Sequence, residues 1–213
     1  MPMSEKSKNK ILNSIAAVRT QRAAAIAVNS HPDSEVYRQV EPDAVSCFKT
    51  ELETISGQCI LCKNEDDFAG KLRELLAEKQ IEKLFCRDAS IAGLLSKHNI
   101  STTSDKSDFE PMQAGITGCE FLVARTGSVL VSSASASGRQ MHAFPPLHFI
   151  IAHQSQLVDY PEDALKAIQQ KYGSKLPSAI TTITGPSRTA DIEKTLVLGA
   201  HGPKELIVML IES

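Results

Sequence analysis

The stretch that decides the fold is QCILCKNEDDFAGKLRELLAEKQIEKLFCRDASIAGLL, residues 58–95. Two short apolar runs, 58–62 and 83–86, each precede a segment whose apolar residues recur at helical spacing. These helical positions are Phe68, Leu72, Leu75 and Leu76, followed by Ile91, Leu94 and Leu95. Short strands alternating with helices predict an α/β fold with a parallel sheet that is covered on both faces.

On the N-terminal side of this stretch, two amphipathic helices are expected. Their apolar stripes are Ile11, Leu12, Ile15 and Val18, followed by Val45, Phe48, Leu52 and Ile55. We expect residues 1–40 to form an N-terminal helical arm and residues 41–213 to form one α/β domain. A single apolar stripe at a chain end must be buried somewhere, so we also expect a homo-oligomer, most simply a dimer.

On the C-terminal side, strands are expected at 120–124 and 128–132, and they form a hairpin around Arg125, Thr126 and Gly127. Further strands are expected at 147–152 and 179–184, with a helix between them. The final aliphatic run, Leu206 to Ile211, is expected to be a buried strand. The sequence contains no internal repeat.

Composition and charge restrict the class of protein. The chain has 213 residues, 42% hydrophobic and 23% charged, with a net charge of −2. This balance provides no basic field for nucleic acid or for an anionic membrane. The opening MPMSEKSKNK lacks the apolar stretch of a signal peptide, and no aliphatic run is long enough to span a bilayer. We expect a cytoplasmic protein with neither a nucleic-acid nor a membrane partner.

The cysteines do not indicate a metal or redox centre. Five are present, and Cys59 and Cys62 form a lone C-x-x-C within an expected strand. Residues three apart on a strand face opposite sides of the sheet, so these thiols should diverge. No set of four thiolates for an iron–sulfur cluster is visible, and the histidines form no zinc pair. Walker A, G-x-G-x-x-G and G-x-S-x-G motifs are absent, so we expect neither a metal nor a cofactor.

Candidate ligand-binding residues follow or precede the expected strands. Ligands in open α/β sheets bind at the carboxyl ends of strands, so we expect these segments to converge there on a small carboxylate or phosphate. The candidates are Thr117, Gly118, Arg125, Thr126, Gly127, Ser128, Arg139, Ser187, Arg188, Thr189, Asp191, His201 and Gly202. Arg188 would supply the positive charge, just before an expected helix.

A structural interpretation of the same segment stays open. Ser187 or Thr189 can cap the expected helix, and Arg188 can pair with Asp191 or Glu193. His201, in the turn Gly199-Ala200-His201-Gly202, can be a hydrogen-bonded turn residue instead of a ligand contact or a general base.

Three blocks resemble the lactate-utilisation protein C family (LutC/YkgG, LUD domain). They are GITGCEFLVARTGSVLV (115–131), PPLHFII (145–151) and ITGPSRTADIEKTLVLGAHGPKELIVMLI (183–211). The resemblance covers roughly residues 45–213. It implies a three-layer α/β/α fold of the NagB/RpiA/CoA-transferase type and a role, beside iron–sulfur partner proteins, in oxidising L-lactate to pyruvate.

One departure from this family concerns Arg125. Relatives usually carry an acidic residue just before the Thr-Gly of the hairpin, and a guanidinium cannot act as a nucleophile or as an acid/base group there. The expected function is therefore an accessory component of a lactate-utilisation system that binds a small anion or a partner. An independent enzyme of the CoA-transferase or sugar-phosphate isomerase type, and a metabolite-binding regulator, are the alternatives.

Overall fold

The computed structural model describes residues 8–17, 39–190, 196–198 and 202–212. The chain divides into two units, Met1–Arg38 and Gln39–Ser213. In the first unit residues 8–17 are helical, and Ile11, Leu12 and Ile15 are each about half exposed. Val18, the last residue of the predicted stripe, lies outside the described residues.

The helices of the second unit begin where the sequence places a capping residue. They are α2 (Ala44–Thr54), α3 (Glu65–Glu78), α4 (Ala89–Lys97) and α5 (Pro161–Tyr172). The side chains of Asp43, Asn64 and Asp88 accept hydrogen bonds from the first-turn amides of α2, α3 and α4, respectively. Such caps satisfy amides that have no partner within the helix. Helix α5 begins instead with a proline, whose missing N–H costs nothing at that position.

A six-stranded parallel sheet forms the centre of this unit, in the order β1-β12-β7-β4-β2-β3. The strands are β1 (Gln58–Cys62), β2 (Leu84–Phe85), β3 (Thr102–Thr103), β4 (Ala114–Thr117), β7 (Leu147–His153) and β12 (Glu205–Ile211). All five neighbouring pairs are parallel. The predicted α/β class and the predicted parallel sheet are therefore confirmed.

Alternate residues of each strand enter two different cores. Phe149 and Ile151 of β7 pack with α3 and α4, whereas Ile150 packs with α2 on the opposite face. Cys62 lies in the first core and Cys59 in the second, as their spacing predicted. Both thiols are buried, so they act as small apolar side chains of the sheet.

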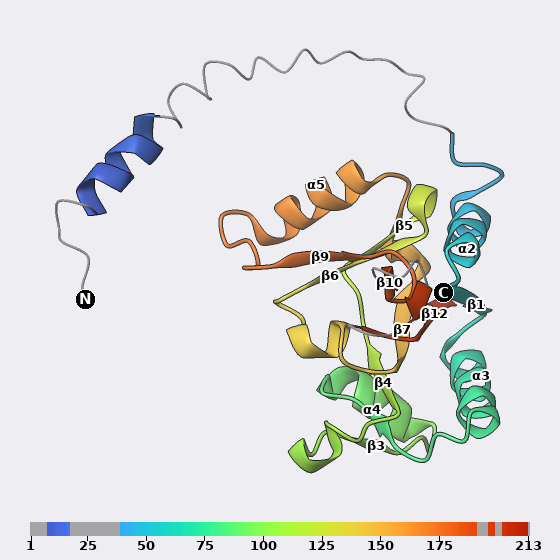
Figure 1. Ribbon diagram of the computed structural model, residues 1–213. Coiled ribbons are helices and arrows are strands. Elements are labelled where there is room, and N and C mark those ends of the chain that lie inside the picture. The colour runs from blue at the N-terminus through green and yellow to red at the C-terminus, as the bar shows by residue number, and fades with distance from the viewer. Residues whose placement is uncertain (1–7, 18–38, 191–195, 199–201, 213) are drawn as a thin grey trace. The chain divides into compact units, whose positions relative to one another are not determined.

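A second sheet of four strands, in the order β8-β5-β6-β9, covers the second face together with α2. Its strands are β5 (Phe121–Val123), β6 (Ser128–Ser132), β8 (Leu157–Val158) and β9 (Ile180–Ile183). Figure 1 shows α5 beside this sheet, on the side away from α3 and α4. Val129 and Val131 face the central sheet, and Leu130 faces α5.

The second sheet was not predicted. The hairpin of 120–124 and 128–132 is confirmed as the antiparallel pair β5–β6, but its pairing with β8 and β9 was not foreseen. Strands β5 and β6 lie between the central sheet and α5, and β6 is buried along its whole length. These two strands therefore lack the alternation that marks a sheet with one solvent-facing side. Among the described helices, none is long and apolar enough to cross a membrane.

Candidate functional site

The connections that leave β2 and β4 run to opposite faces of the central sheet. After β2 the chain enters α4, which contributes Ile91 to the core on one face. After β4 it turns through residues 118–120 into β5, which contributes Leu122 to the core on the other face. The two strands are neighbours in the sheet. Such a switch point opens a crevice at the carboxyl ends of the strands, where α/β proteins bind ligands.

Two hollows occupy this crevice, and they share Asp88, Gly118 and Cys119 as lining residues. The smaller, of about 200 Å³, extends toward Ser132 and Lys171. The larger, of about 530 Å³, runs along α4. Gly118 and Cys119 belong to the turn that follows β4, so this one short turn borders both hollows.

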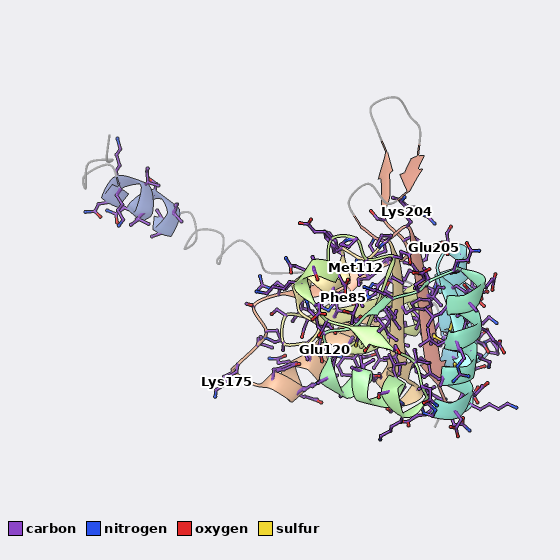
Figure 2. All side chains as sticks on the ribbon, turned by 90° about the horizontal axis from the view of Figure 1, so that it is seen from below. Phe85, Met112, Glu120, Lys175, Lys204 and Glu205 are labelled. Atoms are coloured by element: carbon purple, nitrogen blue, oxygen red, sulfur yellow. The ribbon has the colours of Figure 1, made fainter. Side chains whose placement is uncertain are left out.

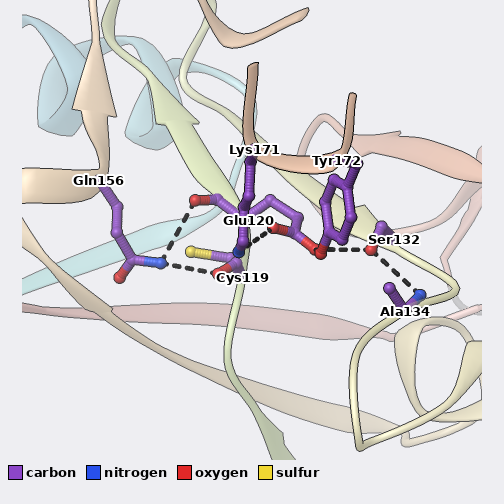
Figure 3. A network of polar contacts seen from close by, with 7 residues as sticks. All are labelled: Cys119, Glu120, Ser132, Ala134, Gln156, Lys171 and Tyr172. Atoms are coloured by element: carbon purple, nitrogen blue, oxygen red, sulfur yellow. Dashed lines mark hydrogen bonds and ion pairs between the residues drawn. The ribbon is translucent and has the colours of Figure 1, made fainter. Parts of the chain in front are cut away.

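Glu120 is the centre of a polar network in the smaller hollow (Figure 3). One carboxylate oxygen, Oε1, accepts hydrogen bonds from Ser132 Oγ and from Tyr172 Oη at 2.7 Å. The other, Oε2, accepts from Lys171 Nζ at 2.8 Å. Gln156 donates to the carbonyl oxygens of Cys119 and Glu120 and thereby holds the backbone of the turn. Residues from β6 and α5 thus fix the carboxylate, and a residue from the segment after β7 fixes the backbone that carries it.

This network keeps both of its charged groups ionised. Burial raises the pKa of Glu120, but the hydrogen bonds from Lys171, Ser132 and Tyr172 outweigh burial and leave the pKa below its ordinary value. The hydrogen bond to Glu120 raises the pKa of Lys171. At neutral pH the hollow therefore contains a carboxylate and an ammonium in direct contact.

Cys119 lines both hollows as a neutral thiol. Burial, followed by the charge of Glu120, raises its pKa to about 12. Burial raises the pKa of the four other cysteines as well. Because the thiolate is the form that attacks a substrate, these thiols are not poised to act as nucleophiles at neutral pH. Within the described part of the chain, no group of three His, Cys, Asp or Glu residues is arranged to hold a metal ion.

Thr117, a predicted ligand residue, lies at the end of β4 and is fully buried. Its hydroxyl is 2.8 Å from Nε2 of His148, which is also fully buried. Burial lowers the pKa of His148 to about 3 and also lowers the pKa of His142. Both imidazoles are neutral at physiological pH, and Thr117 contributes to the core beneath the crevice.

The predicted segment 125–128 packs against α2. Arg125 forms an ion pair with Glu51 of this helix. Gly127 has a φ of +57°, and a Cβ there would overlap the backbone of Leu52. Ser128 Oγ lies 2.9 Å from Thr184 Oγ1. In this structure Arg125 has a structural partner, and the glycine is required by close packing.

The described residues Ser187, Arg188 and Gly202 lie at the amino edge of the central sheet. Arg188 donates to the carbonyl oxygen of Ile55 and to Ser56 Oγ, at the end of α2 and before β1. Ser187 donates its N–H to the carbonyl oxygen of Pro203, just before β12, and an added Cβ on Gly202 would lie 3.0 Å from Ser187 Cβ. Figure 2 shows Lys204 and Glu205, where β12 begins, beside strands β10 (Arg188–Ala190) and β11 (Leu196–Leu198), and Glu120 toward the opposite side.

The helix predicted after Ser187 is wrong. Residues Arg188–Ala190 form strand β10, which pairs antiparallel with β11 (Leu196–Leu198). The Thr189 side chain, Asp191, Glu193 and His201 lie outside the described residues. Arg139 is exposed and donates to Ser178 Oγ.

The described candidates therefore do not gather in one crevice, and Arg139, on Ser178, lies apart from the two groups that follow. Arg125, Gly127, Ser128 and Arg188 gather near the C-terminal half of α2, whereas Gly118 lies at the carboxyl end of β4. The sequence interpretation selected Gly118 but missed Asp88, Glu120 and Lys171. An acid directly after a buried strand, as in GITGCE, was the available signal for Glu120.

Residues 88–211 match the LUD domain family. The chain is 35% identical over 105 residues to lactate utilization protein C of Bacillus licheniformis, which is 48% of this chain and 44% of that protein. It is 32% identical over 108 residues to the uncharacterized protein YkgG of Escherichia coli K12, covering 50% and 47%. The solved structure of a DUF162 family protein from Deinococcus radiodurans aligns with a TM-score of 0.58 at 15% identity, covering 79% of this chain and 96% of that one.

The chain spans about half the length of the curated relatives it matches. The region that matches the family includes Asp88, Glu120 and Lys171, so the smaller hollow lies within the shared domain. The Deinococcus structure supports the mixed α/β fold.

The packing of Gly127 predicts a large effect of a small substitution. Gly127→Ala combines a positive φ with overlap against helix backbone, and we expect it to lower the free energy of unfolding by about 2–4 kcal/mol. Gly118→Ala is the matched control, because its Cβ would meet only Ile91 Cδ1, at 3.7 Å. Urea unfolding of both variants measures the difference, and equal stabilities would contradict the close approach to α2.

The buried histidines predict a loss of stability in mild acid. The folded-state pKa of His148 lies below its value of 6.5 in the unfolded chain. The stability that the neutral imidazole contributes is therefore complete above pH 6.5 and is lost as the pH falls toward 3. From pH 7.5 to 5.0 the unfolding free energy should fall by about 2 kcal/mol. His142 acts in the same direction, whereas Glu120, whose pKa is lowered from 4.5, acts mainly at lower pH. In His148→Gln most of this fall in the unfolding free energy should disappear. The control variant His98→Gln should show the same fall as the wild type.

Proposed function

The chain belongs to the LUD domain family, and from this premise we propose that it is a component of a bacterial L-lactate utilisation system, in which L-lactate is oxidised to pyruvate. The observation that carries the proposal is the match of about half of the chain to proteins named lactate utilization protein C. The matched family region contains the complete set of charged residues in the smaller hollow.

The ligand of the smaller hollow is proposed to be a small monocarboxylate. An ammonium has three N–H donors, and Glu120 accepts only one of those of Lys171. Ser135 lines the same hollow and adds a hydroxyl to it. Asp88 repels a bound carboxylate less than its charge suggests. Its own carboxylate accepts hydrogen bonds from the amide and the hydroxyl of Ser90 at the start of α4. A hollow of about 200 Å³ suits a molecule of the size of lactate or pyruvate.

Electron transfer in this system is assigned to iron–sulfur partner proteins. The five thiols of the chain are divided between the two faces of the central sheet and the crevice. Their raised pKa values disfavour the thiolates that a cluster requires. The proposed role of this chain is therefore to hold the organic acid or to organise the partners.

Glu120 is better suited to position Lys171 than to attack a substrate. Its two oxygens already accept three hydrogen bonds, and its lowered pKa corresponds to a weak base. A carboxylate stabilised in this way is a poor nucleophile, because the same hydrogen bonds must weaken before it can form a bond. This argues for the accessory role over an acyl-transfer reaction at Glu120.

Growth of the host tests the pathway assignment. Deletion of the gene for this chain should abolish growth on L-lactate as the sole carbon source and leave growth on pyruvate unchanged. Reintroduction of the gene should restore growth on L-lactate. A deletion strain that grows normally on L-lactate would refute the proposed role.

Calorimetric titration tests the ligand. L-lactate, pyruvate and inorganic phosphate are titrated into the full chain, and Lys171→Met should weaken carboxylate binding by about tenfold, since a charge-assisted hydrogen bond contributes about 1.5–3 kcal/mol. Lys166→Met, on the same helix with a largely exposed side chain, should have no effect. If Lys171→Met proves less stable than the wild type, Lys171→Arg provides the second test. It keeps a positive charge as the partner of Glu120, so it should retain carboxylate binding. Equal affinity of wild type and Lys171→Met would exclude this residue as the anchor, and so would the absence of carboxylate binding by the wild type.

A further inference from the structure

Arg87, at the carboxyl end of β2, is a partly buried cation without a counter-ion among the described residues. Of the described arginines, Arg87 and Arg125 are partly buried and the others are exposed. Arg125 forms its ion pair with Glu51. No described carboxylate forms an ion pair with Arg87, and the carboxylate of the next residue, Asp88, accepts hydrogen bonds from Ser90 instead. Because partial burial of a charge is costly unless an opposite charge compensates for it, this guanidinium is suited to receive an anion.

Aromatic rings hold the guanidinium in place. The Cζ atom of Arg87 lies 4.5 Å from the ring centroid of Phe109 and 5.6 Å from that of Phe85. Such contacts fix the position of the group and leave its N–H donors free. A guanidinium has five N–H donors, and the hydrogen bond from Nη1 to Gln140 Oε1, at 3.1 Å, is the one that Arg87 makes within the described part of the chain. The remaining donors form a positioned fork.

The turn of residues 133–138 brings open space and a further donor beside this fork. A Cβ added to Gly138 would lie 3.9 Å from Nη1 of Arg87 and would meet no other atom within 4 Å. The preceding residue, Ser137, is fully buried, and its hydroxyl has no hydrogen-bond partner among the residues that the structure describes. Buried hydroxyls are normally hydrogen-bonded, so one without a protein partner beside an unpaired guanidinium indicates a ligand that pairs with both.

We propose that Arg87 and the hydroxyl of Ser137 bind a phosphate group. The fork of a guanidinium matches two oxygens of a phosphate in a bidentate contact, which leaves a further oxygen for the hydroxyl. A carboxylate has two oxygens, and the guanidinium alone occupies both. A phosphate also carries more negative charge than a carboxylate, which favours it at a cation without a counter-ion. The phosphate is either the free ion or part of a small phosphorylated metabolite.

This site is distinct from the smaller hollow. Ser135 of the turn 133–138 lines that hollow, whereas Arg87, Ser137 and Gln140 do not. The turn therefore lies between two anion sites that differ in chemistry, an ammonium beside Glu120 and a guanidinium on aromatic rings. The phosphate site goes beyond the proposed function, and its test uses no carboxylate ligand, so either proposal can fail without the other.

Calorimetric titration of the full chain with inorganic phosphate and with glycerol phosphate tests the site. Arg87→Met keeps an apolar side chain against Phe109 but removes the charge, so it should weaken phosphate binding by about tenfold or more. Arg139→Met is the matched control, because Arg139 is an exposed arginine whose partner is Ser178, and it should bind as the wild type does. Equal affinity for the two probes would identify the free ion as the ligand, and tighter binding of the ester would identify a phosphorylated metabolite. The proposal is overturned if the wild type binds neither probe, or if Arg87→Met and Arg139→Met bind equally well.

Gln140→Glu provides a second test that keeps the guanidinium. The new carboxylate replaces an amide that already accepts from Nη1, so it supplies the missing counter-ion from within the chain. Phosphate affinity should fall by about tenfold, while the free energy of unfolding in urea should stay the same or rise. Gln169→Glu, at an exposed position of α5, makes the same charge change and should leave phosphate affinity unchanged. If Arg87 serves only to cover the aromatic rings, the two glutamate variants will bind phosphate equally, and this result would overturn the proposal even if Arg87→Met does not fold.

Discussion

The buried carboxylate of Glu120 is the group on which the arrangement of the crevice depends. Removing a charge from water is costly unless hydrogen bonds and an opposite charge compensate for it. Here the compensation comes from Ser132 on β6 and from Lys171 and Tyr172 on α5. The carboxylate therefore connects the end of the central sheet to the second sheet and to the helix that covers it. Displacing any of these elements would leave the charge with fewer partners, and the shape of the crevice follows from this requirement.

The fold was largely accessible from the sequence because its determinants are local. The spacing of Phe68 and Leu72, the strand-like divergence of Cys59 and Cys62, and the turn at Gly127 each depend on residues a few positions apart. The site was not accessible in the same way. Glu120 meets partners 12, 51 and 52 positions later in the chain, and no local pattern records such a convergence. Arg188 illustrates the converse, because its residue type suggested a ligand while its partners are the carbonyl oxygen of Ile55 and the hydroxyl of Ser56.

The two edges of the central sheet have different uses. At the amino edge, the N–H of Ser187 donates to the carbonyl oxygen of Pro203. The guanidinium of Arg188 donates to the carbonyl oxygen of Ile55 and to the hydroxyl of Ser56. At the carboxyl edge, the turn at Gly118 leaves two hollows between diverging connections. This division follows from topology, since α4 and β5 leave neighbouring strands toward opposite faces, whereas α2 returns directly into β1. Glycines alone do not distinguish the two edges. Gly127 allows close packing against the backbone of α2, whereas Gly118 leaves space at the crevice.

Net charge does not distinguish the two hollows of the crevice, because each is lined by two carboxylates and one lysine. In the smaller hollow the ammonium of Lys171 retains donors beyond the one that Glu120 accepts, so an added carboxylate meets a cation there. Glu120 already accepts three hydrogen bonds and Asp88 accepts two, and these bonds reduce the repulsion that their charges exert on a bound acid. Because Glu120 also fixes the position of Lys171, the smaller hollow offers its donors in one defined place. The placement of these donors, more than the net charge, therefore makes this hollow suitable for a small acid.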